Sequence, residues 1–178
     1  MEKGYEIPVL DHGCVRYVSS SRSSPDANCE DGEVKLDIRA PAFLAPTLSS
    51  RQPSRDINLV NEFYIPEKWL KQNNEDKEGT IEAINLKHEF YTEMAEDFCK
   101  QAYDLYENMI ESNVSIRMAR MLLPDNIYVD IRSCMSLKEL VLLSKLNGEP
   151  IPGEIQDYRK AILQIAAELF PKTIKSND

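Results

Sequence analysis

The chain has 178 residues, of which 42% are hydrophobic, and this is enough for one globular domain with a core of its own. Its net charge of −9 at pH 7 argues against non-specific nucleic-acid binding, which needs an excess of Lys and Arg. No apolar run approaches the roughly 20 residues of a membrane span, and the residues after Met1 do not form a signal-peptide pattern. We therefore expect a single domain over residues 1–178, in the cytoplasm, without nucleic-acid or membrane partners.

Residue types that carry metal or nucleophilic chemistry are few and scattered. The cysteines lie far apart in the sequence without a Cys-x-x-Cys pair: Cys14, Cys29, Cys99 and Cys134. In such a chain reduced thiols are the simplest expectation. The two histidines do not join a His/Cys cluster with zinc spacing, and no Gly-rich phosphate loop or Gly-x-Ser-x-Gly elbow is present. The sequence therefore predicts no metal site and identifies no catalytic residue.

The first part of the chain predicts two strands. Residues 5–18 are rich in β-formers, and Asp11-His12-Gly13 supplies a bulge or a turn. Residues 19–33 are rich in Ser, Pro, Asp and Asn, which predicts a loop. Residues 34–39 alternate apolar and charged side chains, which is typical of a half-buried strand.

A long helical pattern occupies the middle of the chain. A polar loop over residues 71–80 precedes it, and Thr80 is a suitable N-cap. Apolar residues then recur every three to four positions over residues 81–112, which predicts one helix. Such a helix is too long to be covered by one small sheet, so we expect part of it to pack against another subunit or another helix. Asn113 is expected to be its left-handed C-cap.

The segment Ser115–Pro124 predicts a short helix that ends at the proline. Ile116, Ala119 and Leu123 share one face at helical spacing, and Arg120 lies beside that stripe. An arginine in this place can keep its aliphatic stem on the core and aim its guanidinium into a cleft. The alternative is an ordinary solvated arginine at a helix end.

The last part of the chain predicts a strand and two helices. The strand covers residues 127–131, a helix capped by Ser136 runs to Asn147, and the final helix covers residues 154–169, before a tail over residues 172–178. The expected fold class is therefore α/β (α+β), with a small mixed or antiparallel sheet, one long helix and several shorter helices.

Segments of this scaffold resemble the flavin-dependent (alternative) thymidylate synthases. The segments that carry the resemblance are Leu10-Asp11, Ala40-Pro41, Phe63-Tyr64-Ile65-Pro66, Ala119-Arg120…Leu123-Pro124 and Glu154-Ile155. In that family a flavin is reduced by NADPH, and a methylene group from folate passes to C5 of dUMP. The resemblance implies one thymidylate synthase-like domain, a dUMP-like nucleotide as ligand, FAD as cofactor and assembly into an oligomer.

The resemblance also implies roles for individual residues. Arg120 stands where the family's Ala-Arg arginine binds the dUMP phosphate. Arg55 stands where a second phosphate-binding arginine reaches in from a neighbouring subunit, although an ordinary loop arginine is the alternative reading. Lys145 is an approximate stand-in for the arginine of the family's Leu-Arg, and Arg51 is at most a remnant of the Arg-His-Arg motif. Both are weaker candidates for nucleotide or cofactor contacts.

The chain departs from the family where the chemistry occurs. The His-x-x-Pro-Phe-Glu segment has no counterpart between the two predicted N-terminal strands, and the Arg-His-Arg motif is absent. The motifs for FAD are thus largely missing, whereas both phosphate-binding arginines have a counterpart. A lysine in place of a guanidinium does not restore its planar pair of donors.

These observations lead to a hypothesis and two alternatives. The hypothesis is a degenerate member, or pseudoenzyme, that binds a nucleotide phosphate, or acts as a homo-oligomer or as a hetero-oligomer with a related synthase, or does both. The first alternative is an active FAD-dependent thymidylate synthase, or a related pyrimidine nucleotide methyltransferase that transfers a one-carbon unit to dUMP. The second is a structural interaction module without a ligand.

Overall fold

The structure is a computed structural model that describes residues 2–21, 32–48, 58–71, 81–82, 87–145 and 153–174. The chain divides into two compact units. The sheet unit comprises Met1–Val60 and Tyr128–Asp178, and the helical unit comprises Asn61–Ile127.

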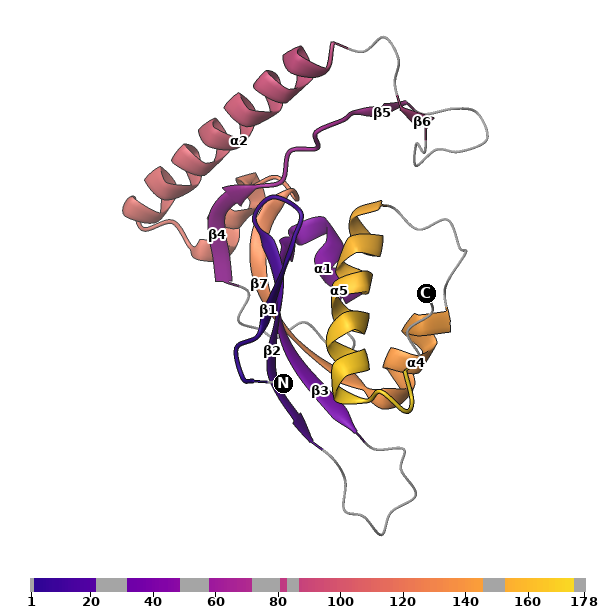
Figure 1. Cartoon of the computed structure of the whole chain (residues 1–178). Helices are drawn as coiled ribbons and strands as arrows, with labels where there is room; N and C mark the ends of the chain where they lie inside the picture. Colours follow the sequence, from indigo (N-terminus) through magenta and orange to yellow (C-terminus); the bar gives the residue numbers. More distant parts are fainter. Residues whose placement is uncertain are drawn as a thin grey trace. The chain divides into compact units, whose positions relative to one another are not determined.

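The sheet has five strands in the order β1-β2-β3-β7-β4 (Figure 1). Their bounds are Glu6–Val9 (β1), Gly13–Ser21 (β2), Glu33–Pro41 (β3), Asn58–Phe63 (β4) and Ile127–Ser136 (β7). The pairs β1–β2, β2–β3 and β3–β7 are antiparallel. Together with the helices described below, this confirms the expected fold class.

The strand predicted over residues 5–18 is a hairpin of β1 and β2, so the predicted interruption is a turn. Leu10 in this turn has a φ of 57°, a left-handed conformation that is uncommon for a leucine. Gly13 follows, and a Cβ atom at this position would lie 2.0 Å from the Tyr158 hydroxyl and 2.6 Å from the Val9 carbonyl oxygen. The close approach of the Tyr158 hydroxyl therefore requires a glycine here.

Side chains of β3 and of the last helix form the core of the sheet unit. The three aliphatic residues of the predicted second strand, Val34, Leu36 and Ile38, are all buried, which confirms the alternation seen in the sequence. Helix α5 (Gly153–Leu169) buries Ile162 and Ile165 and contacts β1, β2, α1 and α4, as Figure 1 shows for the α5 side of the sheet. This arrangement leaves the alternate side chains of the strands on the opposite, outer face.

Short helices complete the sheet unit. A 3-10 turn, η1 (Ala42–Leu44), leads into α1 (Ala45–Leu48). Helix α4 (Leu137–Lys145) begins with a capping box, in which Glu139 N donates to Ser136 Oγ and Ser136 N donates to Glu139 Oε2. The predicted cap at Ser136 is thereby confirmed.

The long helix of the helical unit begins later than predicted. Helix α2 covers His88–Glu111, whereas Ile81–Glu82 form strand β6 and pair with Leu70–Lys71 of β5. The prediction of helix from residue 81 is wrong because backbone pairing in this hairpin replaces helical bonds at Ile81–Glu82. The loop prediction for residues 71–80 is wrong at Lys71, and its other residues lie outside the described part.

One face of α2 packs within the helical unit. The Trp69 indole N–H donates to Thr92 Oγ1 over 3.1 Å, the Phe63 and Tyr103 rings meet edge to face, and Cys99 is buried beside Asn126. At the far end Asn113 has a φ of 60°, so the predicted left-handed C-cap is confirmed. None of the described helices is long and apolar enough to cross a membrane.

Candidate functional site

Arg120 lies at the junction of two short helical turns in the helical unit. Helix α3 (Ile116–Ala119) continues directly into the 3-10 turn η2 (Arg120–Leu122). The predicted short helix is therefore present, and its start is fixed by backbone bonds from Met118 N and Ala119 N to the Ser115 carbonyl. Ser115 occupies the N-cap position, but its side chain makes no capping hydrogen bond.

The buried face predicted for this segment is only partly correct. Ala119 is buried completely, whereas Ile116 is 56% exposed. One small residue suffices to seat this short helix, while Leu123 is half-buried and Ile116 faces outward. Met118 and Met121 are exposed as well, and Arg120 is an exposed arginine with apolar neighbours along the chain. A phosphate-binding arginine in such a place would lie on a surface suited to protein contact.

The other predicted site residues lie in the other unit or outside the described residues. Lys145 is exposed at the end of α4 in the sheet unit. Arg51 and Arg55 lie outside the described residues. The grouping of these residues into one nucleotide site therefore stays a prediction.

Arg159 is a buried cation that the sequence reasoning missed. It is only 6% exposed, and its Nε donates to the Leu143 carbonyl oxygen over 2.8 Å. A guanidinium at the last turn of a helix complements the negative end of the helix dipole. It thereby fixes the end of α4 that carries Lys145. The signal was its position beside the buried Tyr158 in the apolar stripe of α5.

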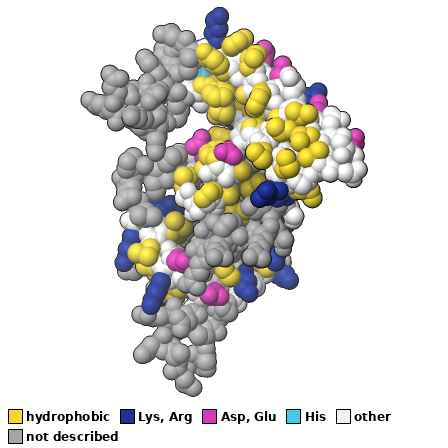
Figure 2. Space-filling model, turned by 180° about the vertical axis from the view of Figure 1, so that it is seen from behind, with side chains coloured by type: hydrophobic (Ala, Val, Ile, Leu, Met, Phe, Trp, Pro, Cys, Tyr) yellow, Lys and Arg dark blue, Asp and Glu magenta, His cyan; other side chains and the backbone are white. Residues whose placement is uncertain are grey.

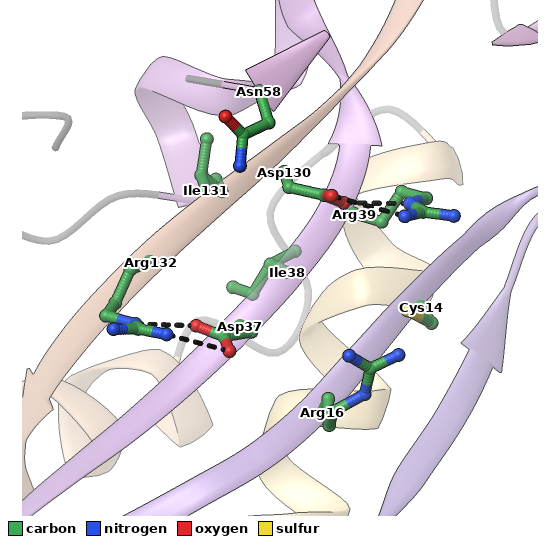
Figure 3. Close-up of a pocket in the computed structure, with 9 residues that line it drawn as sticks. All are labelled: Cys14, Arg16, Asp37, Ile38, Arg39, Asn58, Asp130, Ile131 and Arg132. Atoms are coloured by element: carbon green, nitrogen blue, oxygen red, sulfur yellow. Dashed lines mark hydrogen bonds and ion pairs between the residues drawn. The ribbon is translucent and has the colours of Figure 1, made fainter. Parts of the chain in front are cut away.

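A charged pocket on the outer face of the sheet also went unpredicted. The pocket has a volume of about 320 Å³, and its lining includes three arginines from adjacent strands: Arg16 of β2, Arg39 of β3 and Arg132 of β7. Two aspartates line it as well, Asp37 and Asp130 (Figure 3). The signal was the alternation of β2, β3 and β7, which places these side chains on the face opposite the core.

Ion pairs hold the guanidiniums of this pocket. Arg39 donates from Nε and Nη2 to the two Asp130 carboxylate oxygens over 2.8 and 3.2 Å. Arg132 donates in the same way to Asp37 over 2.7 and 3.1 Å. Arg16 Nε donates to Glu6 over 2.7 Å. The carboxylate partners raise the pKa of Arg16 and of Arg132, so these arginines stay charged at all ordinary pH values.

Cys14 and Asn58 complete the polar lining of the pocket. Burial, followed by the charge of Glu6, raises the pKa of the Cys14 thiol. The thiol is therefore neutral near pH 7 and adds no negative charge. Among the described residues no group of three or more His, Cys, Asp or Glu side chains could hold a metal ion. The chemistry that this pocket offers is the binding of charged groups.

Comparisons with known proteins agree with this fold. A family profile described as Thymidylate synthase complementing protein matches residues 15–172. A flavin-dependent thymidylate synthase of Thermus thermophilus is 31% identical over 145 residues, which cover 77% of this chain and 53% of that protein. One of Thermosipho melanesiensis is 29% identical over 183 residues, which cover 98% of this chain and 79% of that protein. The chain thus spans about half the length of the Thermus relative.

A solved structure extends the comparison to the whole fold. The UMP/dUMP methylase PolB from Streptomyces cacaoi, bound with 5-Br dUMP, superimposes with a TM-score of 0.72 at 17% sequence identity. The superposition covers 95% of this chain and 96% of that chain. At this level of identity the likeness is one of fold.

Proposed function

The chain belongs to the family of thymidylate synthase complementing proteins, and from this premise we propose that it binds the phosphate of a dUMP-like nucleotide through Arg120 while part of an oligomer. A guanidinium suits this role because its planar fork of donors matches phosphate oxygens. The completely buried Ala119 anchors the backbone from which Arg120 projects. Arg55 is the second proposed phosphate contact, and Lys145 and Arg51 are weaker candidates for nucleotide or cofactor contacts. Full flavin catalysis is proposed to be lost, because the family motifs for it are largely missing from the sequence.

The observation that carries the proposal is the exposed apolar surface of the helical unit. Nine of the twelve large hydrophobic side chains that are exposed in the described chain belong to this unit. They are Phe90, Tyr91, Met94, Phe98, Leu105, Ile116, Met118, Met121 and Leu122. Arg120 lies within the same stretch of chain as the last four. Exposed apolar patches of this kind mark surfaces of protein association.

The α2 residues of this set form one stripe. At 3.6 residues per turn, Phe90, Met94, Phe98, Leu105 and Tyr91 fall within a sector of about 100°. Thr92, Cys99 and Tyr103 of the face that packs within the helical unit lie on nearly the opposite side. Helix α2 thus has two apolar faces, and only one of them is covered by the described chain. Figure 2 shows hydrophobic side chains gathered in a band over α2.

A second copy of the chain is the proposed occupant of this surface, with a related synthase as the alternative. Three half-exposed aromatic rings alone offer about 300 Å² of apolar surface, since each such side chain can bury 150–250 Å². With the neighbouring Met, Leu and Ile side chains the surface approaches the roughly 800 Å² per partner of a stable interface. We therefore expect this surface to be covered in the working protein.

Nucleotide binding is tested by titrating the full chain with dUMP and comparing Arg120→Gln with Arg117→Gln. Both arginines are exposed and lie in the same segment, so Arg117→Gln is a matched control for charge loss. We expect Arg120→Gln to weaken dUMP binding by about tenfold or more and Arg117→Gln to change it by less than about twofold. Equal losses in the two variants, or no dUMP binding by the unmodified chain, would contradict the proposal.

Association is tested by sedimentation velocity with Phe98→Glu and Leu142→Glu. Phe98 lies in the α2 stripe, whereas Leu142 is an exposed residue of α4 in the sheet unit. We expect the unmodified chain and Leu142→Glu to sediment as oligomers, and Phe98→Glu as a monomer. The association would be contradicted if the unmodified chain sediments as a monomer and binds no related synthase.

A second candidate function is methyl transfer to the uracil ring, as an active family member. The observation that favours it is that the chain covers 96% of a chain described as a UMP/dUMP methylase, so the two differ little in extent. The described pocket is lined by guanidiniums and carboxylates, which suit a charged group rather than the ring of a flavin. Turnover of dUMP in the presence of reduced FAD and a methylene-folate donor would establish this candidate over the first.

A further inference from the structure

We propose that the outer face of the sheet carries a second oxyanion site, in which Arg16, Arg39 and Arg132 bind a phosphate or a carboxylate group. This site lies in the sheet unit and is made without Arg120, so it goes beyond the proposed function.

The strand register brings the three arginines together. Arg16 of β2 pairs with Asp37 of β3, which in turn pairs with Arg132 of β7. Two residues further along the strands, Cys14 pairs with Arg39, and Arg39 pairs with Asp130. Adjacent strands are about 4.8 Å apart and alternate residues on one face about 7 Å apart. The backbone positions of the three arginines thus lie within about 10 Å of one another. Each carries its guanidinium on a long side chain.

The aspartates orient two of these guanidiniums. In both pairs one carboxylate takes the Nε and Nη2 donors of its arginine in a side-on arrangement, which Figure 3 shows for Asp37 and Asp130. A guanidinium has five N–H donors, so a side-on carboxylate leaves the Nη1 donors of Arg132 for a second acceptor. A donor whose rotamer is already fixed loses less entropy when a ligand binds.

The donors of the pocket suit an anion. Its lining contains three arginines and two aspartates, and Glu6 beside it pairs with Arg16, so each guanidinium has one carboxylate partner. The thiol of Cys14, whose pKa is raised by burial, is neutral, and Asn58 contributes an uncharged amide. A pocket of about 320 Å³ admits a phosphate, a diphosphate or a small carboxylate.

The test is calorimetric titration of the full chain with pyrophosphate and, separately, with citrate. Arg132→Gln removes a guanidinium from the pocket. Lys160→Gln is the matched control, since Lys160 forms an exposed ion pair with Asp157 on α5, over 3.0 Å, outside the pocket. We expect saturable binding of at least one probe, a loss of about tenfold or more in Arg132→Gln, and no change in Lys160→Gln. The preferred probe identifies the source of the oxyanion as a phosphate or a carboxylate compound.

Two further variants keep this test separate from that of the nucleotide site. Arg132→Lys keeps the charge, and we expect it to recover part of the affinity because lysine offers a point charge without the planar fork. Arg120→Gln should leave probe binding unchanged, just as Arg132→Gln should leave dUMP binding unchanged. The second oxyanion site is overturned if neither probe binds, if Lys160→Gln loses as much affinity as Arg132→Gln, or if Arg120→Gln alone abolishes probe binding. Failure of dUMP to bind would overturn the proposed function and leave this site standing.

Discussion

The two units of the molecule use their hydrophobic residues in opposite ways. All but three of the buried hydrophobic side chains of the described chain belong to the sheet unit, the exceptions being Cys99, Ala119 and Ile127. Nine of the twelve exposed large ones belong to the helical unit. Since buried apolar area is the main source of stability, the sheet unit carries its own core. The helical unit instead presents apolar surface that another molecule can cover.

The largest expected effect comes from truncating the same residue type in each unit. Leu36 is completely buried on the core face of the sheet, whereas Leu105 is 50% exposed on α2. We expect Leu36→Ala to lower the free energy of unfolding by about 2–5 kcal/mol, because it removes buried contacts and leaves a cavity. Leu105→Ala should cost about 1 kcal/mol or less in a dilute, dissociated sample. Urea unfolding of both variants at low protein concentration measures the difference.

The same pair of variants can break the comparison. At high protein concentration a covered α2 stripe makes Leu105→Ala more costly, because an oligomer adds its association free energy to stability. If Leu105→Ala is as damaging as Leu36→Ala even at high dilution, the helical unit has a core of its own and the contrast fails.

A second comparison concerns two glycines of the sheet unit. A Cβ atom at Gly13 would lie closer than van der Waals contact to the Tyr158 hydroxyl and the Val9 carbonyl oxygen. A Cβ atom at Gly153 would meet nothing within 4 Å. We expect Gly13→Ala to destabilise the protein by about 1–3 kcal/mol through overpacking. Gly153→Ala, at the start of α5, should be neutral or slightly stabilising. Thermal unfolding of the two variants measures this, and equal midpoints would show that the packing around Gly13 is loose.

The sequence was most informative where one local rule decided the structure. Alternation placed Val34, Leu36 and Ile38 in the core, and the Ser136 cap and Asn113 C-cap followed from their side-chain chemistry. It failed at Ile81–Glu82, where pairing with another strand outweighed a helical pattern. It also failed at Ile116, because helical spacing shows which residues share a face but not whether that face is covered.

The candidate site residues also divide into those that a local pattern can identify and those that depend on strand pairing. Arg120 was singled out because a resemblance attached a role to one position, and the structure confirms the short helical turn on which it lies. The pocket of Arg16, Arg39 and Arg132 depends on the register of three strands that are distant in the sequence. No local pattern fixes such a register, since charged residues alternate with apolar ones on any half-exposed strand.

A buried tyrosine of the sheet unit should make stability depend on pH under alkaline conditions more strongly than a tyrosine of the helical unit. Tyr128 is completely buried and its hydroxyl donates to Asp11, so burial and then Asp11 raise its pKa well above its ordinary value of 10.0. Above about pH 10 the unfolded chain loses this proton while the folded chain keeps it. Stability should therefore fall by up to about 1.4 kcal/mol per pH unit there.

Tyr128→Phe should remove this contribution to the pH slope, although it also costs a hydrogen bond at every pH. Tyr103→Phe is the control in the helical unit. Burial also raises the pKa of Tyr103, but this residue is only partly buried, so its contribution to the slope should be smaller. Urea unfolding between pH 8 and pH 11 measures both slopes. A slope that is unchanged in Tyr128→Phe would show that the Tyr128 hydroxyl ionises as easily in the folded state as in the unfolded one.

The smallest expected effects come from the helix starts, where the two units also differ. Helix α4 begins with the Ser136–Glu139 capping box, whereas Lys87, the N-cap residue of α2, makes no side-chain capping hydrogen bond. We expect Ser136→Ala to cost about 1 kcal/mol, and Lys87→Ser to gain at most about 0.5–1 kcal/mol by supplying an acceptor and removing a positive charge from the helix N-terminus. Hydrogen exchange of the first-turn amides of each helix locates the change. If Lys87→Ser slows exchange in α2 without strengthening association, then the uncapped start only limits the helix locally. If it also strengthens association, then the ordering of α2 is part of what assembly requires, because a partner that binds an ordered helix no longer has to order it.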